Sequence, residues 1–350
     1  MGPVRTVLVG YGVGGAAFHA PFLAAVDGIE PVAVVTGNPE RQAEVRERHP
    51  GAEVIATTDE VFARAGEFDL VVITVPNRFH VPLATRALEA GLHVVVDKPF
   101  AGTAAQGRAL AAVADKAERV LGVYQNRRFD GDFRTVRRLV DEGRLGQVYR
   151  FESRFERWRP HVRVGGWKEQ PEPEAFNGLL YDLGTHLIDQ AVALFGPPTH
   201  VYAELDRRRP GALVDDDAFV ALTHADGVRS HLWMSAVAAD LGPRFRVLGS
   251  TAAYVKYGMD PQEEALRAGA RVDVPGWGTE PTDAWGRLGT PGETVPVETE
   301  PGAYQDYYAA IVRAVRGEGP APVEIDEAVT VLATIEAALR SSADGVTVTM

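Results

Sequence analysis

The stretch Val4–Gly15, V-R-T-V-L-V-G-Y-G-V-G-G, decides the fold of this chain. Its first six residues predict a strand, and residues 16–26 follow with a helical apolar pattern. Between the two, Gly10, Gly12 and Gly15 match the spacing G-x-G-x-x-G, in which the glycines allow a tight turn, close approach of a pyrophosphate and close packing of helix on strand. We therefore predict a dinucleotide-binding loop that also includes Val13 and Gly14. The alternative is a merely flexible glycine turn.

The same alternation of strand and helix continues through the first third of the chain. Strands are predicted at Pro31–Val35, Glu53–Ile55, Asp69–Val75, Val94–Val96 and Val120–Tyr124, with helices between them, one of them capped by Thr58. Such alternation predicts a parallel, doubly wound sheet. Right-handed crossovers bring the strand ends after Gly10, Val75 and Asp97 to one edge, where ligands bind in sheets of this kind.

The stretch Leu92–Phe100, L-H-V-V-V-D-K-P-F, ends one of these strands abruptly. Pro99 cannot donate to a sheet ladder, and it disfavours helical torsions at the residue before it. A lysine, Lys98, is therefore expected at the carboxyl end of an interior strand, beside Asp97. A solvated lysine in an ordinary loop is the alternative for this stretch alone.

The end of the second strand bears on the choice of dinucleotide. An NAD site usually has an acidic residue here that accepts a hydrogen bond from the ribose 2′-hydroxyl, but this chain has Thr36, Gly37 and Asn38. Arg41, in the first turn of the next helix, is suited to a 2′-phosphate. We predict NADP, with NAD as the alternative. Asn38 is also a natural helix cap, in which case Arg41 is simply solvated.

The pattern changes after Tyr124. A helix is expected at 133–142, a long strand at 147–158, a loop at 157–178, a helix at 183–195, strands at 201–205, 218–223, 229–236 and 245–248, a loop-rich insertion at 258–300, and helices at 304–316 and 325–342. Runs of strands without helices between them predict a second, α+β domain with a mainly antiparallel sheet. We place a dinucleotide-binding Rossmann domain at 1–124 and a substrate-binding, dimerising domain at 125–350.

Asp182 and His186 are the candidate acid–base pair of the second domain. They are four residues apart, so both project from the same face of a helix, and Leu183 and Leu187 begin the apolar stripe that anchors it. Histidine titrates near neutrality and can take a hydroxyl proton while hydride leaves the same carbon. The alternatives are a carboxylate favoured by the helix dipole and a buried histidine with satisfied hydrogen bonds.

Composition narrows the functional class. The chain has 350 residues, no cysteine and a formal charge of 36 − 48 = −12, without a basic block. We therefore expect no nucleic-acid or membrane partner, no disulfide and no metal site. Because no long apolar stretch opens the sequence, we expect no signal peptide or spanning helix, and a cytoplasmic location.

Together these motifs resemble the glucose–fructose oxidoreductase / inositol dehydrogenase / rhizopine-catabolism family of sugar and cyclitol dehydrogenases. The matching residues are the glycine loop, Pro76-Asn77-x-x-His80, Val96-Asp97-Lys98-Pro99 and Asp182-x-x-x-His186, in the family's order across both domains. Residues 124–130, 181–190 and 254–264 resemble the NADP-dependent scyllo-inositol dehydrogenase branch. The family more often has glutamate where Asp97 stands here.

The resemblance implies roles for these residues. Lys98 would hydrogen-bond the reacting hydroxyl and the nicotinamide ribose, His186 would be the general acid/base, and Asp182 would orient it or bind a neighbouring hydroxyl. The remaining candidates are cofactor contacts at Pro76, Asn77, His80, Asp97 and Pro99, and substrate contacts at Arg127, Arg157 and Trp167, for which exposed loop residues are the alternative. The family's Lys-Pro bond is often cis, which makes Lys98–Pro99 a candidate.

The predicted activity is hydride transfer between NADP and a secondary alcohol or ketone of a sugar or cyclitol, with scyllo-inositol as leading candidate, in a homo-oligomer. Two alternatives on the same fold are a dinucleotide-sensing regulator without turnover and a glycosidase that holds NAD tightly. Retention of both Lys98 and His186 argues against the regulator.

Overall fold

The computed structural model describes residues 2–162 and 165–350, which form two compact units. The first unit contains the chain up to Asn126 together with Gln262–Trp277 and Ala303–Ala328, and the second contains Arg127–Pro261, Gly278–Gly302 and Val329–Met350. Two segments of the region expected to form the second domain therefore belong to the first unit. The assignment of cofactor binding to one domain and substrate binding to the other stays a proposal.

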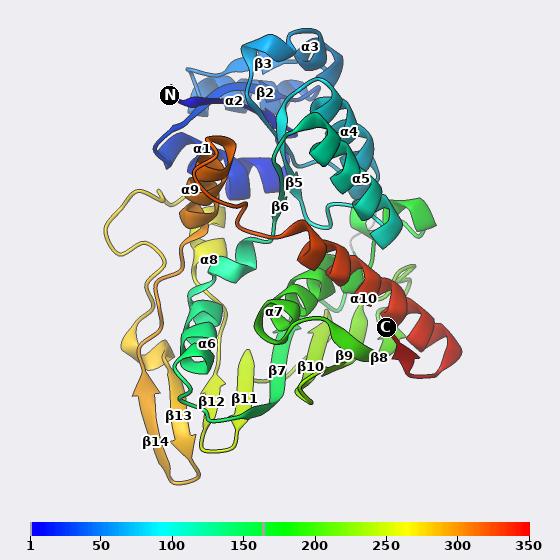
Figure 1. Ribbon diagram of the computed structural model, residues 1–350, viewed down its shortest axis with the longest axis vertical. Coiled ribbons are helices and arrows are strands. Elements are labelled where there is room, and N and C mark those ends of the chain that lie inside the picture. The colour runs from blue at the N-terminus through cyan, green and yellow to red at the C-terminus, as the bar shows by residue number, and fades with distance from the viewer. Residues whose placement is uncertain (1, 163–164) are drawn as a thin grey trace. The chain divides into compact units, whose positions relative to one another are not determined.

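The first unit is built on a six-stranded sheet in which every strand is parallel to its neighbours (Figure 1). The spatial order is β3-β2-β1-β4-β5-β6. The strands are β1 Val4–Val9, β2 Ile29–Val35, β3 Glu53–Ile55, β4 Leu70–Ile73, β5 His93–Asp97 and β6 Leu121–Tyr124. The prediction of a doubly wound parallel sheet is confirmed.

The helices of the first unit connect these strands, except for the last two, which come from the later segments of the chain. They are α1 Ala20–Ala25, which follows a π-helical turn at Gly14–His19, then α2 Pro39–Arg48, α3 Thr58–Ala63, α4 His80–Glu89, α5 Ala104–Ala117, α8 Gln262–Arg267 and α9 Tyr304–Val315. The cap of α3 is Thr57 rather than the expected Thr58, because its hydroxyl accepts the Glu60 N–H at 3.4 Å.

The strand order places the glycine loop that follows β1 at the topological switch point of the sheet. Strands β1 and β4 are neighbours, but their connections run to opposite edges of the sheet. All four residues of β4 are buried, as expected for an interior strand covered on both faces. Such a switch point leaves a crevice at the carboxyl ends of the strands, where ligands bind in open α/β sheets.

The second unit contains a nine-stranded sheet of order β14-β13-β12-β11-β7-β10-β9-β8-β15. Its strands are β7 Val148–Glu156, β8 Pro198–Asp206, β9 Asp217–His224, β10 Arg229–Ser235, β11 Phe245–Gly249, β12 Ala253–Lys256, β13 Gly286–Thr290, β14 Glu293–Val297 and β15 Val348–Thr349. All neighbouring pairs are antiparallel except β7 and β10, which confirms the mainly antiparallel sheet.

Helices pack on one face of this sheet. They are α6 Gly131–Asp141, α7 Thr185–Phe195 and α10 Ile325–Asp344, the last beginning within the first unit. Their inward residues, among them Phe133, Leu187 and Ile335, form one apolar core with the inward residues of the strands. On β9 and β10 buried and half-buried side chains alternate, so the other face of the sheet is more exposed.

Two regions expected to be irregular differ in how much regular structure they contain. The insertion at 258–300 contains the hairpin β13–β14, which sequence patterns did not reveal because β14 is mostly exposed and carries no alternation of apolar and polar residues. In the loop expected at 157–178, the described residues contain short 3₁₀ turns at Trp167–Glu169 and Pro173–Ala175 and an isolated bridge from Trp158 to Val237. Residues 163 and 164 of that loop lie outside the described residues.

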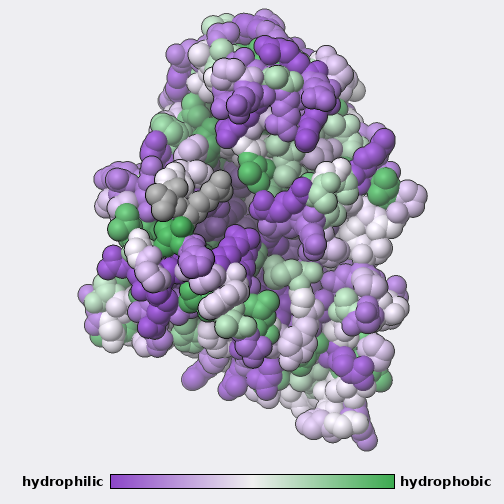
Figure 2. Space-filling view, turned by 180° about the vertical axis from the view of Figure 1, so that it is seen from behind, coloured by the Kyte–Doolittle hydropathy of each residue, from purple (hydrophilic) through white to green (hydrophobic). Residues whose placement is uncertain are grey.

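The surface agrees with the charged composition. The face drawn in Figure 2 is mostly hydrophilic, with apolar side chains in small, scattered groups. Among the described helices, none combines the length and the apolar content that a membrane span requires.

Candidate active site

The glycine loop has the geometry of a phosphate cradle. Gly10 has a φ of +100°, and a Cβ there would collide with the Thr74 carbonyl, while a Cβ at Gly15 would collide with the carbonyl of Gly10. Gly12 differs, because the nearest atom to its Cβ position is an Arg41 guanidinium nitrogen at 3.9 Å. Two glycines thus allow close packing and the third leaves space above the backbone, which fits a bound pyrophosphate.

The end of β2 carries the residues that were expected to select the dinucleotide. Thr36 is buried, and its carbonyl accepts a hydrogen bond from the Gln42 side chain at 2.9 Å. Asn38 caps α2, because its Oδ1 accepts the backbone N–H of Arg41 at 3.0 Å. The side chain of Arg41 is exposed and lies beside Gly12, so the capping of α2 leaves the guanidinium available to a ligand.

His80 has a contact pattern that the sequence did not predict. Its ring is buried, with Nδ1 2.8 Å from the Pro99 carbonyl oxygen and Nε2 2.8 Å from the Val75 carbonyl oxygen. Burial lowers its pKa, which favours the neutral ring with one N–H to donate. The ring therefore lies between the ends of β4 and β5, and its single N–H donates to one of the two carbonyls. Pro76 and the 3₁₀ turn Asn77–Phe79 lie at the same end of β4.

The segment after β5 presents Lys98 as expected, and the Lys98–Pro99 peptide bond is cis. Asp97 Oδ1 accepts the backbone N–H of Lys98 at 2.8 Å, and Thr74 Oγ1 lies 3.4 Å from Asp97 Oδ2. Burial raises the pKa of the Asp97 carboxyl, but the His19 imidazole and the Lys98 charge lower it more, to about 2. Asp97 is therefore ionised at neutral pH, next to a half-buried Lys98.

In the second unit the candidate pair spans two consecutive elements. Asp182 belongs to a π-helical turn, Leu180–Gly184, and His186 to the first turn of α7. His186 is only 6% exposed. Asp182 Oδ1 accepts a hydrogen bond from Lys168 Nζ at 2.7 Å. The carboxylate therefore faces a cation supplied by a loop 14 residues earlier in the chain.

Buried polar contacts fix the helix that carries His186. Asp189, one turn further along α7, forms a two-pronged ion pair with Arg128, with distances of 2.8 and 2.6 Å. Gln190 Oε1 accepts from Arg244 at 3.0 Å, and both residues are buried. A buried bidentate pair of this kind restricts the geometry of its helix strongly, because breaking it would leave an uncompensated charge.

The three candidate substrate residues occupy different environments in the second unit. The guanidinium groups of Arg127 and Arg157 lie 4.6 and 4.5 Å from the ring centre of Phe155. Arg127 is 5% exposed and forms an ion pair with Asp130 at 3.2 Å, so the alternative of an exposed loop residue does not describe it. Trp167 is 40% exposed, and Lys168 Nζ lies 5.5 Å from its ring centre.

Sequence reasoning missed three residues that touch the candidates. They are Thr74 and His19, beside Asp97, and Lys168, beside Asp182. The available signals were weak: a histidine within the apolar pattern after the glycine loop, and a lone lysine in a loop rich in Arg, Trp and Pro.

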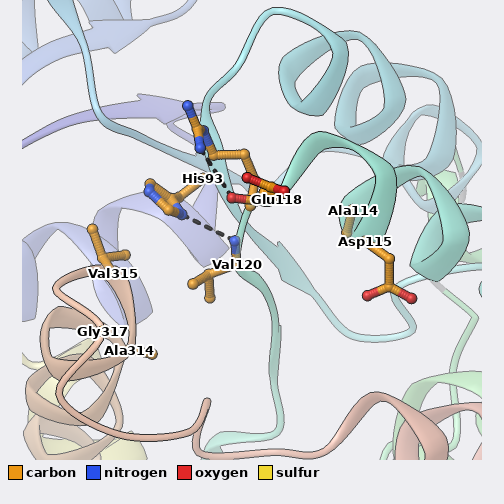
Figure 3. A pocket seen from close by; sticks show the side chains of 9 residues that line it. His93, Ala114, Asp115, Glu118, Val120, Ala314, Val315 and Gly317 are labelled. Atoms are coloured by element: carbon orange, nitrogen blue, oxygen red, sulfur yellow. Dashed lines mark hydrogen bonds between the residues drawn. The ribbon is translucent and has the colours of Figure 1, made fainter.

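A separate surface hollow of about 480 Å³ lies at the amino ends of β5 and β6, opposite the glycine loop (Figure 3). The Nδ1 of His93 accepts the Val120 N–H at 3.0 Å, and Glu118 and Arg119 border the opening. Because amino ends of parallel strands face away from the ligand edge of such sheets, this hollow is not part of the candidate active site.

Fold and loop geometry together define a Rossmann-type dinucleotide-binding protein, and comparison with known proteins supplies the family and its activity. Residues 4–125 match the model of the oxidoreductase family's NAD-binding Rossmann fold, and residues 137–350 match the C-terminal alpha/beta domain of the same family. The chain belongs to the Gfo/Idh/MocA oxidoreductase family. The family predicted from the sequence is therefore confirmed, as is a nicotinamide-dependent dehydrogenase of the class that acts on CH–OH groups.

Several relatives match nearly the whole chain, among them the following two. The uncharacterized oxidoreductase YdgJ of Escherichia coli K12 is 42% identical, covering 97% of this chain and 96% of its own. The scyllo-inositol 2-dehydrogenase (NADP(+)) IolW of Bacillus subtilis 168 is 34% identical over an alignment that covers 97% of this chain and 94% of IolW. The solved structure of yvaA from Bacillus subtilis superposes with a TM-score of 0.92 at 32% identity, covering 99% of each chain.

Proposed function

We propose that this protein is an NADP(H)-dependent dehydrogenase that interconverts a secondary alcohol and a ketone on a cyclitol or sugar, with scyllo-inositol as the leading candidate substrate. IolW, a relative over 97% of this chain, is an NADP-linked scyllo-inositol dehydrogenase. The D-glucoside 3-dehydrogenase of Escherichia coli K12 is 32% identical over 56% of this chain. Both names point to a ring that carries several hydroxyl groups.

The observation that carries the proposal is the position of Arg41 beside the glycine loop. Its guanidinium nitrogen lies 3.9 Å from the Cβ position of Gly12, and no acidic residue stands at 36–38 to accept from a ribose 2′-hydroxyl. A guanidinium is the group best suited to a phosphate, because its planar fork donates to two oxygens at once. These two features together favour NADP over NAD.

The chemistry assigned to the chain is proton transfer and charge stabilisation. A bound nicotinamide supplies the hydride acceptor or donor. His186 takes the proton of the reacting hydroxyl during oxidation and returns it during reduction. Lys98 donates a hydrogen bond to the reacting oxygen and stabilises its developing negative charge. Asp182, paired with Lys168, orients the ring or accepts from a neighbouring hydroxyl.

A panel of inositols and aldoses, each assayed with NADP and with NAD, tests the proposal directly. We expect turnover with NADP and a preference for scyllo-inositol. Arg41→Ala should raise the KM for NADP about 10- to 100-fold, the loss expected for a hydrogen bond to a charged group, and leave that for NAD unchanged. The matched control is Arg46→Ala, an exposed arginine in the last turn of the same helix.

Three outcomes would contradict the proposal. A clear preference for NAD in the wild-type protein would refute the assignment of Arg41. Binding of NADPH without turnover of any polyol would favour the dinucleotide-sensing regulator instead. A cofactor that stays bound through purification, together with release of a glycosyl leaving group, would favour the glycosidase.

The predicted oligomer is proposed to form through the more exposed face of the nine-stranded sheet. Phe219, His231 and Trp233 cluster there, with ring centres 5.1 to 6.0 Å apart, and the Arg154 guanidinium lies 4.0 Å from the Trp233 ring. A second copy would cover these aromatic rings. Trp233→Glu should lower the mass measured by sedimentation, whereas Trp158→Glu should not.

The predicted cytoplasmic location likewise stays a proposal.

A further inference from the structure

A buried histidine lies directly behind the glycine loop. His19 is the last residue of the π-helical turn Gly14–His19, and its side chain is 0% exposed. Its Nδ1 is 2.5 Å from the hydroxyl of Tyr308, on α9, and its Nε2 is 3.7 Å from Asp97 Oδ2. The first contact is a short hydrogen bond, and the second is an ion-pair distance. All three residues belong to the first unit.

Asp97 connects this histidine to the main chain of Lys98. The carboxylate has two oxygens with different partners: Oδ2 faces His19, and Oδ1 accepts the backbone N–H of Lys98 at 2.8 Å. Any displacement of the Asp97 carboxylate therefore moves the acceptor of the Lys98 backbone N–H. Lys98 is the residue assigned to the reacting oxygen.

Buried aromatic rings surround this connection. The His19 ring packs on Tyr124 at 4.2 Å between ring centres, and Tyr307 and Tyr308 pack around Tyr124 at 4.9 and 5.7 Å. Because these rings exclude solvent from the imidazole side, they lower the local dielectric there, which strengthens the interaction between the imidazole and the carboxylate.

The glycine loop closes over the same group. A Cβ at Gly14 would lie 2.5 Å from Thr74 Oγ1 and 3.5 Å from Asp97 Oδ2. A side chain at Gly14 would collide with the Thr74 hydroxyl, which itself lies 3.4 Å from Asp97 Oδ2. The loop that would hold the dinucleotide and the residue before Lys98 are therefore packed around one carboxylate.

We propose that His19, held by Tyr308, is a positioning residue that fixes the Asp97 carboxylate and, through it, the backbone of Lys98. The proposal rests on the role assigned to Lys98 above. It gives Asp97 a function that does not require contact with the substrate. It also accounts for a buried polar side chain in the middle of an aromatic cluster, where an apolar residue would otherwise pack with less cost.

The test uses two substitutions of His19, each of which keeps a polar group near the position of a different ring nitrogen. His19→Asn keeps a polar group near the position of Nδ1, facing Tyr308, and removes the group that faces Asp97. His19→Gln places an amide N–H near the position of Nε2. We expect His19→Asn to lower kcat about 10- to 100-fold, as small misplacements of a catalytic group do, with the Kd for NADPH changed less than about threefold. His19→Gln should recover part of kcat.

Two measurements on the protein without cofactor do not depend on activity: the NMR signal of the Asp97 carboxyl carbon and the hydrogen exchange of the Lys98 amide. The ionisable groups around Asp97 that influence its charge are His19, Lys98, His80, Tyr307 and Tyr308. With a pKa of about 2, the Asp97 ¹³Cγ signal should not move between pH 7 and pH 4 in the wild type. In His19→Asn the imidazole no longer opposes the effect of burial, which raises the pKa of Asp97. The Asp97 signal should therefore titrate between pH 7 and pH 4. Hydrogen exchange of the Lys98 amide should also become faster.

The control is His224→Asn in the second unit. His224 is also buried and has two partners, the Gly196 carbonyl and the Ser230 hydroxyl, both at 2.9 Å. It should lower thermal stability to a similar degree without changing kcat at saturating substrate. If His19→Asn behaves in the same way, His19 is only a core residue and the proposal is wrong.

A double-mutant cycle with Asp97→Asn decides the route of the effect. If His19 acts through Asp97, the loss of kcat in His19→Asn should vanish in the Asp97→Asn background. Additive losses would overturn the proposal, as would unchanged Asp97 titration and Lys98 exchange in His19→Asn. If the wild-type protein turns over no polyol, the proposed function fails, and the titration and exchange measurements still decide whether His19 fixes Asp97 and Lys98.

Discussion

Lys168 Nζ lies 2.7 Å from Asp182 Oδ1, so the carboxylate expected to assist His186 has a cation as its partner. The Lys168 side chain is 53% exposed and that of Asp182 is 25% exposed. An ion pair this open to solvent contributes little to stability, because water competes for both charges. Because Asp182 precedes the proposed general base by only four residues, we propose that the pair orients the carboxylate or binds a substrate hydroxyl.

Lys168→Met should therefore reduce activity and leave the fold intact. Removing the cation frees the Asp182 carboxylate to rotate and to repel an alkoxide-like transition state. We expect kcat/KM for the polyol to fall about tenfold, the cost of roughly one charge-assisted hydrogen bond, and the melting temperature to stay the same. Lys116→Met, at an exposed position of α5, is the matched control. Equal effects of the two substitutions would refute the role of Lys168.

Lys98→Met and His186→Ala should each lower turnover by at least about 100-fold, the usual contribution of general acid–base or oxyanion stabilisation. The effect should appear in the single-turnover rate of nicotinamide reduction, with the affinity for NADPH retained in His186→Ala. His200→Ala, at an exposed strand position, serves as the control. Near-normal turnover in both active-site variants would overturn the assignment.

Lys256→Met should destabilise the second unit strongly. Lys256 is 1% and Glu280 is 4% exposed at the side chain, with Nζ 3.1 Å from Oε1. Loss of the lysine leaves a buried carboxylate without its cation, which costs about 3–5 kcal/mol. Equilibrium urea unfolding measures this loss, and Lys256→Met combined with Glu280→Leu should recover most of it. Arg271→Met breaks an exposed pair with Asp273 and should have little effect.

Asp215 predicts a pH dependence of stability. Its carboxylate accepts the Leu180 N–H at 2.7 Å, and burial raises its pKa from 3.8 to about 6. Between pH 4 and pH 6 the folded state therefore binds this proton more tightly than the unfolded state, so stability falls as the pH rises through that window.

Asp215→Asn keeps an oxygen for Leu180 and removes the charge. The free energy of unfolding of this variant, relative to wild type, should increase by about 2 kcal/mol between pH 4 and pH 7. Parallel pH profiles of the two proteins would show that Asp215 titrates normally. Because Leu180 opens the turn that carries Asp182, the same substitution also reports on the stability of that turn.

Local patterns were enough to predict much of the fold. Strands such as Leu70–Ile73 are recognisable because an interior parallel strand is apolar on both faces. The hairpin β13–β14 escaped prediction because its exposed residues have no such requirement. The return of residues 262–277 and 303–328 to the first unit also escaped prediction, because helix periodicity records that a face is buried but not which sheet buries it.

The sequence by itself determined the parallel sheet, the glycine loop at its switch point and the lysine after β5. Each of these depends on neighbouring residues, through backbone torsions or side-chain alternation, so each leaves a local pattern. Only the tertiary structure decided that Tyr308 holds His19 across 289 residues, that His19 faces Asp97, and that Lys168 pairs with Asp182. Such contacts join residues that are distant in the chain, and their physical cause, the exclusion of water around matched polar groups, has no period that a single sequence can display.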